Sequence, residues 1–195
     1  MSGLHSSSIA LLVAAASCGA AAPAYAVDGP ERLYVQVAIC EGEDVPADIV
    51  ASAERIAGDV YRAIGVAIEW SDAGCAEGER SLTVNMIPRQ ASLVHVSEVT
   101  LGFAEPGTSV ATILYDRVVA YARRYRVKRD VLLGYVMAHE LGHLLLPPNS
   151  HSAEGVMRSE INMEEAAAKR LRFTKEQGRL IVRKIETSSL SLATH

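Results

Sequence analysis

The sequence of 195 residues lacks a long apolar segment, an excess of basic residues and any internal repeat. Its apolar runs are too short for a transmembrane helix, which needs about 20 consecutive apolar residues. The net charge of -4 argues against a dedicated nucleic-acid-binding protein. Without a repeat or a low-complexity linker, a chain of this length fits a single domain once any targeting segment is removed.

The N-terminal segment has the features of a secretory signal. A short alanine-rich apolar run spans residues 9–16, and Ala24-Tyr25-Ala26 matches an A-x-A cleavage signal. We therefore expect residues 1–26 to be a signal peptide and residues 27–195 to form one exported domain, periplasmic or secreted. The segment before the apolar run has no Lys or Arg, and Ala15-Ala16-Ser17-Cys18 faintly resembles a lipoprotein site. A lipoprotein and an uncleaved anchor are the alternatives, and stable membrane insertion is not expected after cleavage.

Cysteine is scarce, with three in the chain, and Cys18 would leave with the signal peptide. The remaining Cys40 and Cys75 would then be an even pair in an oxidising compartment. Between them the pattern predicts a strand over Leu33–Ile39, a helix over Pro46–Ile64 and a strand over Val66–Trp70. Such a unit is usually parallel, so both cysteines fall near the carboxyl ends of neighbouring strands. We expect a disulfide between Cys40 and Cys75, with two free buried thiols as the alternative.

The middle of the chain continues the mixture of strands and helices. Alternation predicts a strand over Ser81–Ile87, and Val110–Tyr115 is a further strand. Residues 89–109 are mostly loop, punctuated by glycine and proline, and contain His95, which as a lone loop histidine is expected on the surface. Asp116–Arg126 is expected to be helical.

A metal-binding motif follows, because residues 139–143 read H-E-x-x-H. The apolar lead-in over residues 131–138 predicts a buried helix, and Pro147 ends it. Residues four apart share one helix face, so His139 and His143 can bind one ion together. Glu140 points beside the ion, where it can take a proton from metal-bound water. The alternative is a buried helix with two core histidines, each of which would need a buried polar partner.

The segment after this helix carries a family resemblance. A third histidine, His151, and a later methionine, Met157, follow H-E-x-x-H, and this order resembles the metzincin metallopeptidases. The chain also resembles small exported bacterial proteins with H-E-[LI]-G-H-L-L-L and H-S-x-x-G-[IV]-M. Their similarity extends to three other segments, Gly102-Phe103-Ala104, Tyr115-Asp116-Arg117-Val118 and Arg172-Phe173-Thr174.

This resemblance implies the roles of the site residues. His139, His143 and His151 would hold one Zn²⁺, Glu140 would be the general base, and Met157 would form the floor beneath the metal. The chain departs from the metzincin pattern, since Leu146 replaces the glycine and Asn149 occupies the position of the third histidine. Alternative third ligands are Glu164 and Glu160 downstream and Glu154 in the loop.

The resemblance also implies an α+β fold. We expect a twisted mixed β-sheet packed on two long helices, the second carrying the motif, and then a small helical C-terminal lobe. Val110–Tyr115 is our candidate for the edge strand beside the cleft. In the lobe, residues 164–171 favour a helix, and Thr174 with Gln177 predicts a capping box for a last helix.

The main hypothesis is an exported zinc-dependent metalloendopeptidase acting on peptides or proteins. A catalytically inactive zinc-binding module on the same fold is the second hypothesis, and Glu140 argues against it because such a module needs no base there. A zinc hydrolase of a non-peptide substrate is the third. Little chain lies between residue 26 and the first strand, so we expect no long inhibitory propeptide.

Overall fold

The computed structural model describes residues 33–41, 45–71, 81–87, 97, 99–105 and 107–190. The expected signal peptide, residues 1–26, lies outside this part of the chain, as do His95 and Cys75. None of the described helices combines the length and the apolar character needed to cross a membrane.

The centre of the described chain is a five-stranded mixed sheet with the strand order β2-β1-β3-β5-β4. Its strands are β1 (Leu33–Glu41), β2 (Val66–Ser71), β3 (Leu82–Ile87), β4 (Gly102–Ala104) and β5 (Val110–Leu114). The first, second, third and fifth strands run parallel, and β4 is antiparallel to β5. The expected parallel pairing of the two strands on either side of the first helix is confirmed.

The expectation that Val110–Tyr115 forms the edge of the sheet is wrong. That segment forms β5, which lies between β3 and β4, and the short strand β4 is at the edge. β4 falls within residues 89–109, which the sequence analysis treated as mostly loop. Three residues that begin with a glycine are too few to show the alternation by which a strand is recognised.

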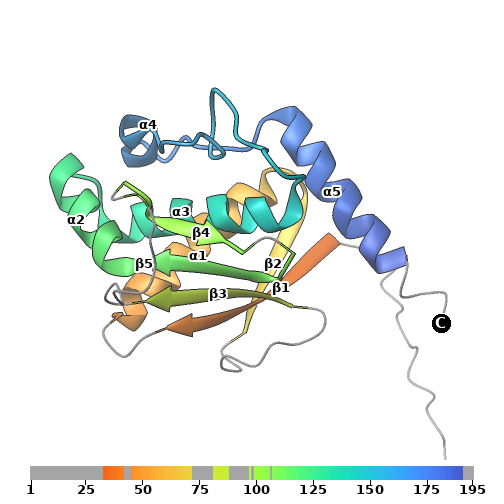
Figure 1. Ribbon diagram of the computed structural model, residues 1–195, viewed down its shortest axis with the longest axis horizontal. Coiled ribbons are helices and arrows are strands. Elements are labelled where there is room, and N and C mark those ends of the chain that lie inside the picture. Colours follow the sequence, from red (N-terminus) through yellow and green to blue (C-terminus); the bar gives the residue numbers. More distant parts are fainter. Residues whose placement is uncertain are drawn as a thin grey trace, which may run out of the picture. The chain divides into compact units, whose positions relative to one another are not determined.

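Five helices accompany the sheet (Figure 1). They are α1 (Ala47–Arg62), α2 (Tyr115–Tyr125), α3 (Arg129–Leu145), α4 (Met163–Ala167) and α5 (Lys175–Leu190). The long helices α1 and α3 lie together on one side of the sheet (Figure 1). The helix that carries H-E-x-x-H is therefore the second of this packed pair, and the shorter α2 precedes it in the chain.

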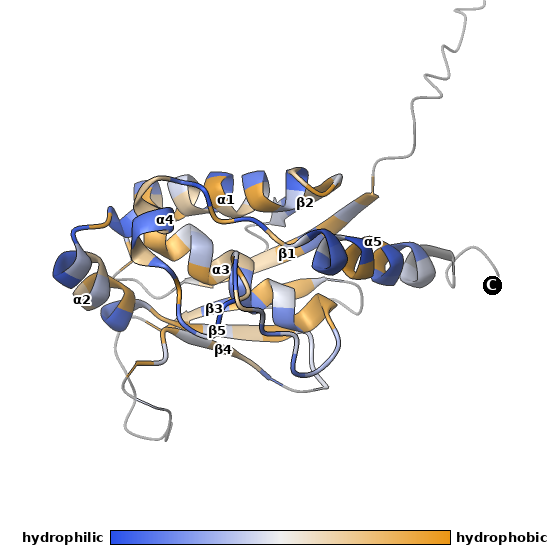
Figure 2. Ribbon diagram, turned by 90° about the horizontal axis from the view of Figure 1, so that it is seen from above, coloured by the Kyte–Doolittle hydropathy of each residue, from blue (hydrophilic) through white to orange (hydrophobic). Residues whose placement is uncertain are grey.

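Helix α1 has an apolar face of the kind its sequence predicts. Hydrophobic and hydrophilic residues alternate along its ribbon (Figure 2), and Ala53, Ala57 and Val60 are fully buried. This face packs on α3 at close range, because a Cβ at Gly134 would lie 2.7 Å from both the Ala53 carbonyl oxygen and the Ile56 Cβ. A glycine is needed at this crossing for the two backbones to come so close together.

Helix α3 is buried along nearly its whole length. Residues 131–142 are all buried, because α1, the sheet and the chain that follows the helix cover its different sides. Beyond Leu145 the chain becomes extended at Leu146 (φ -100°, ψ 161°), immediately before Pro147. The predicted end of the motif helix at the two prolines is confirmed, and the packed helix fixes the direction in which the residues of its C-terminal half project.

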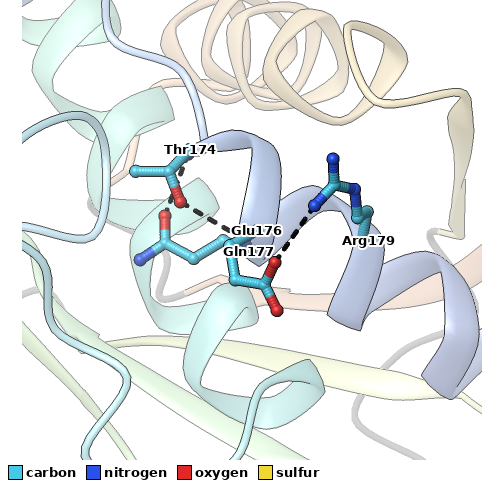
Figure 3. A network of polar contacts seen from close by, with 4 residues as sticks. All are labelled: Thr174, Glu176, Gln177 and Arg179. Carbon is cyan, nitrogen blue, oxygen red and sulfur yellow. Dashed lines mark hydrogen bonds and ion pairs between the residues drawn. The ribbon is translucent and has the colours of Figure 1, made fainter.

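The chain after α3 is largely irregular until α5. The expected helix over residues 164–171 is shorter than predicted, since α4 ends at Ala167. The predicted capping box at the start of α5 is confirmed by two hydrogen bonds, from the Thr174 N–H to Gln177 Oε1 at 3.0 Å and from the Gln177 N–H to Thr174 Oγ1 at 3.2 Å (Figure 3). The buried Leu171 and Phe173 attach this segment to the core.

Cys40 is buried near the carboxyl end of β1, where the sequence analysis expected it. It is the one cysteine in the described part of the chain, because Cys18 and Cys75 both lie outside it. The disulfide between Cys40 and Cys75 therefore stays a prediction.

Candidate metal centre

Three histidine rings meet beside the C-terminal half of α3. His139 and His143 project from successive turns of the helix, and their Nε2 atoms are 3.0 Å apart. His151 comes from the loop beyond the helix, and its Nε2 lies 3.1 Å from that of His143. Ligand atoms of the three residues all lie within 4.8 Å of one another. The structure thus brings together the three histidines that the sequence analysis proposed.

His151 reaches this position although it falls two residues later than the third histidine of the metzincin pattern. The chain leaves α3 in an extended conformation at Leu146 and then turns at Asn149, which has a positive φ of 61°. Asparagine adopts this left-handed conformation more readily than most residues. The turn sends the chain back along the helix end. Asn149 itself lines the cleft but is not part of the histidine cluster.

A backbone carbonyl fixes the orientation of His139. Its Nδ1 lies 2.8 Å from the carbonyl oxygen of Val156, and only a protonated nitrogen can donate to that acceptor. The proton is therefore on Nδ1, and the Nε2 lone pair faces the other two rings. Sequence analysis missed Val156, because a residue that acts through its backbone carbonyl leaves no signal in the identity of its side chain.

Met157 is fully buried directly below the motif helix. A Cβ at Gly142 would lie 2.5 Å from Met157 Sδ and 3.2 Å from Phe173 Cε1, so the absence of a side chain at Gly142 makes room for both. The Met157 carbonyl also accepts a hydrogen bond from the Ser152 N–H at 2.9 Å. The methionine thus packs against the motif helix, and its backbone carbonyl holds one end of the His151 loop.

Burial keeps the helical histidines neutral. Desolvation, with the nearby rings of His139 and His151 adding to it, lowers the pKa of His143 to about 4. Desolvation also lowers the pKa of His139, while the hydrogen bond that its ring donates to the Val156 carbonyl raises it. Near neutral pH both rings therefore have free lone pairs, which is the form that binds metal ions.

Glu140 lies beside the histidine cluster and outside it. Its side chain is buried and lines the same cleft, and burial raises the pKa of its carboxyl group to about 8. It packs against the edge strand, because a Cβ at Gly102 would lie 2.9 Å from Glu140 Cγ and 3.0 Å from Oε1. The sequence analysis expected this glutamate beside the ion position, but Gly102 was not identified as its neighbour.

The cluster fits a tetrahedral metal ion. Two nitrogens that each lie 2.0–2.1 Å from a tetrahedral zinc ion are about 3.3 Å apart. The distances of 3.0 and 3.1 Å from the His143 Nε2 to the other two Nε2 atoms are close to that value. When all three Nε2 atoms carry their lone pairs, the lone pairs repel one another, and a cation bound between them removes this repulsion.

The alternative third ligands lie apart from this cluster. In the described part of the chain, the group able to hold a metal ion consists of the three histidines alone. Glu164 is exposed in the first turn of α4, and Glu154 is exposed in the loop. Glu160 is exposed and lines the cleft, but it is not a member of the group.

A cleft of about 1230 Å³ contains the histidines and Glu140. One wall is the edge strand β4 with the residues on either side of it. Tyr121 and Tyr125 of α2, whose rings are 5.6 Å apart, form part of another wall, and Ile161 and Met163 line it near α4.

Comparisons with known proteins agree with this architecture. No family model matches the sequence, and no curated protein is similar enough to match. Among solved structures, archaemetzincin from Methanopyrus kandleri is 14% identical with a TM-score of 0.51, covering 82% of this chain and 99% of the archaeal one. A zinc-dependent peptidase from Methanocorpusculum labreanum is 15% identical with a TM-score of 0.51, covering 75% and 99%. At these identities the likeness shows that the chain shares its fold with archaemetzincin and a zinc-dependent peptidase.

Proposed function

We propose that this protein is an exported zinc-dependent metallopeptidase. The observation that carries the proposal is the convergence of three histidine Nε2 atoms in a cleft that also contains the carboxyl group of Glu140. The likeness of the fold to archaemetzincin supports it. Export rests on the signal-like residues 1–26, and the N-terminal sequence of the protein recovered from its native cells tests it. An N-terminus at residue 27 is expected, and an intact residue 1 in the cytosol would contradict export.

The ligands of one Zn²⁺ would be His139, His143 and His151. Three imidazoles with a fourth position left open are the donor set of a catalytic zinc ion. When bound there, zinc would polarise a substrate carbonyl and acidify a water molecule. Val156 holds the His139 ring with its Nε2 toward the site, and Met157 packs beneath the helix that carries two of the ligands.

Glu140 would act as the general base. It would take a proton from the attacking water molecule onto a carboxylate oxygen and later pass that proton to the leaving amine. This role needs the ionised carboxyl, whereas burial raises the pKa of Glu140 to about 8. A divalent cation held by the neighbouring histidines favours the ionised form, because opposite charges at short range lower a carboxyl pKa. Gly102 leaves the space in which the side chain lies.

The substrate would be a peptide or an unfolded protein segment in an extended conformation. Strand β4 is at the sheet edge and lines the cleft, so its outer backbone groups are available for pairing with an added strand. Endopeptidase action fits this arrangement, because a cleft along an open strand accepts chain on both sides of the site.

A comparison of the protein with its Glu140→Gln variant tests the proposal. Zinc content is measured by atomic absorption, and hydrolysis is followed on a broad peptide library by mass spectrometry. We expect one zinc per chain in both proteins and hydrolysis by the unmodified protein alone. Full activity in the variant would refute the role of Glu140. Zinc in both proteins with hydrolysis in neither would favour an inactive zinc-binding module.

The third ligand has its own test. We expect His151→Ala to weaken zinc binding sharply and the matched Glu164→Ala to leave the affinity nearly unchanged. The reverse result would mean that Glu164 of α4, and not His151, is the third zinc ligand. It would also remove the reason for placing Met157 beneath the metal. Isothermal titration with competing chelators covers the required range of affinities.

A further inference from the structure

Gln177 of α5 is buried and hydrogen-bonded to the loop that carries His151. Its Nε2 donates to the Ser150 carbonyl oxygen at 3.0 Å and to Ser152 Oγ at 3.1 Å, so it contacts the residues immediately before and after the histidine. Its side chain is 7% exposed. Figure 3 shows the amide oxygen turned toward Thr174 and the amide nitrogen directed away from α5.

Neighbouring backbone groups determine this orientation of the amide. The Thr174 N–H can only donate, so the atom that faces it must be Oε1. The Ser150 carbonyl can only accept, so the atom that faces it must be Nε2. Ser152 Oγ gives its own proton to the Glu154 carbonyl at 2.7 Å and therefore accepts from Gln177. In a flipped amide, Nε2 would face the Thr174 N–H, which is also a donor, and Oε1 would face the Ser150 carbonyl, which is also an acceptor.

The ring of His151 depends on this contact more than the other two rings do. His139 and His143 are on a buried helix, and Val156 holds the His139 ring through Nδ1. His151 is exposed in a loop, and none of the described residues hydrogen-bonds to its Nδ1. Its place is therefore set by the backbone on either side of it, which Gln177 holds from α5.

We propose that Gln177 is a positioning residue that holds His151 at the metal centre. This inference rests on the proposed zinc site. One carboxamide performs two tasks at once, because its oxygen caps α5 and its nitrogen holds the His151 loop. The two tasks can be separated chemically, since a carboxylate can replace the oxygen but cannot donate in place of the nitrogen.

The Gln177→Glu variant makes this separation. Glutamate is an ordinary partner in a capping box, so the helix start is retained. Its second oxygen would face the Ser150 carbonyl, where two acceptors repel, and the loop would be released. We expect zinc affinity to fall at least about tenfold, the lower range for groups that orient metal ligands. The added negative charge would by itself strengthen the binding of a cation, so it cannot explain a loss of zinc affinity.

The matched control is Thr174→Ala. It removes the Oγ1 acceptor of the capping box and leaves both bonds from Gln177 Nε2 to the loop in place. We expect its zinc affinity to stay within about twofold of the unmodified protein, well short of the tenfold range of ligand-orienting groups. An equal loss of affinity in both variants would mean that Gln177 acts only through the stability of α5, and the inference would be wrong.

A double-mutant cycle with His151→Ala decides whether the effect passes through the histidine. In the His151→Ala background, Gln177→Glu should change zinc affinity by less than about twofold, because the ligand that it positions is absent. Substituted Co²⁺ gives an independent readout, since its visible absorption intensity reports the loss of a ligand. An equal loss of affinity with and without His151 would overturn the inference.

Hydrogen exchange of the metal-free protein separates this inference from the proposed function. The Ser152 N–H, which donates to the Met157 carbonyl, should exchange faster in Gln177→Glu and not in Thr174→Ala. Unchanged exchange would show that Gln177 does not hold the loop, whatever the protein binds. If exchange rises but the unmodified protein binds no zinc, the metal site fails while the loop contact stands, and the positioning role is refuted.

Discussion

Removing the Glu140 carboxyl should change how the stability of the metal-free protein depends on pH. Burial raises the pKa of Glu140 to about 8 in the folded chain, whereas an unfolded chain has a value near 4.3. Between these values the folded state holds a proton that the unfolded state has lost. Stability therefore falls as the pH rises through this range, and the loss is complete above the folded pKa.

The magnitude follows from the same pKa values. A difference of one bound proton between the folded and unfolded states changes the free energy of unfolding by about 1.4 kcal/mol per pH unit. Because Glu140 is already partly ionised near pH 8, the change between pH 7 and pH 8 is about 1 kcal/mol. The lowered pKa values of His139 and His143 act in the opposite direction, mainly below pH 6.5, so this window reports Glu140.

Urea unfolding of the chelator-treated protein measures this difference. The free energy of unfolding is determined at pH 7.0, 7.5 and 8.0 for the unmodified chain and for Glu140→Gln, which has no proton to release. The unmodified chain should lose about 1 kcal/mol relative to the variant across the window. Parallel pH profiles would refute the reasoning, because they would mean that the carboxyl is solvated rather than packed against Gly102.

Two glycines give further predictions. Gly134→Ala should destabilise the protein by about 1–2 kcal/mol in urea unfolding, because overpacking against the α1 backbone exceeds the gain of about 1 kcal/mol in helix propensity. Its control, Gly58→Ala, has its nearest neighbour at 3.9 Å and should be neutral or stabilising; equal effects would contradict the close helix crossing. Gly102→Ala should keep zinc but lose most hydrolysis, since its Cβ displaces Glu140. Full peptidase activity in that variant would exclude the contact.

The local part of the site could be predicted because helix geometry is regular. Four residues of spacing put His139 and His143 on one face, and the structure places both there. The position of His151 depends on a turn at Asn149, and residue spacing alone does not describe that turn. The capping box at Thr174 and Gln177 was predicted correctly, but only as a helix start.

Contacts between distant segments could not be predicted from periodicity. Gln177 reaches a loop 25–27 residues earlier in the chain, and Val156 contributes a carbonyl that any residue could supply. β4 was missed as the sheet edge because it is short. Strand order also depends on which segments pair in space, so Val110–Leu114 could be identified as a strand without revealing that β4 covers its outer side.

The order in which the chain is synthesised determines when its candidate metal centre is completed. The motif helix ends at Leu145, but the Val156 N–H is held by the Arg172 carbonyl at 2.8 Å, and the His151 loop is held by Gln177. A nascent chain that has emerged only as far as α4 has all three histidines and neither of these restraints. The proposed zinc site would therefore be held in full only after α5 has been made, so we expect incomplete polypeptides to bind zinc more weakly than the full chain.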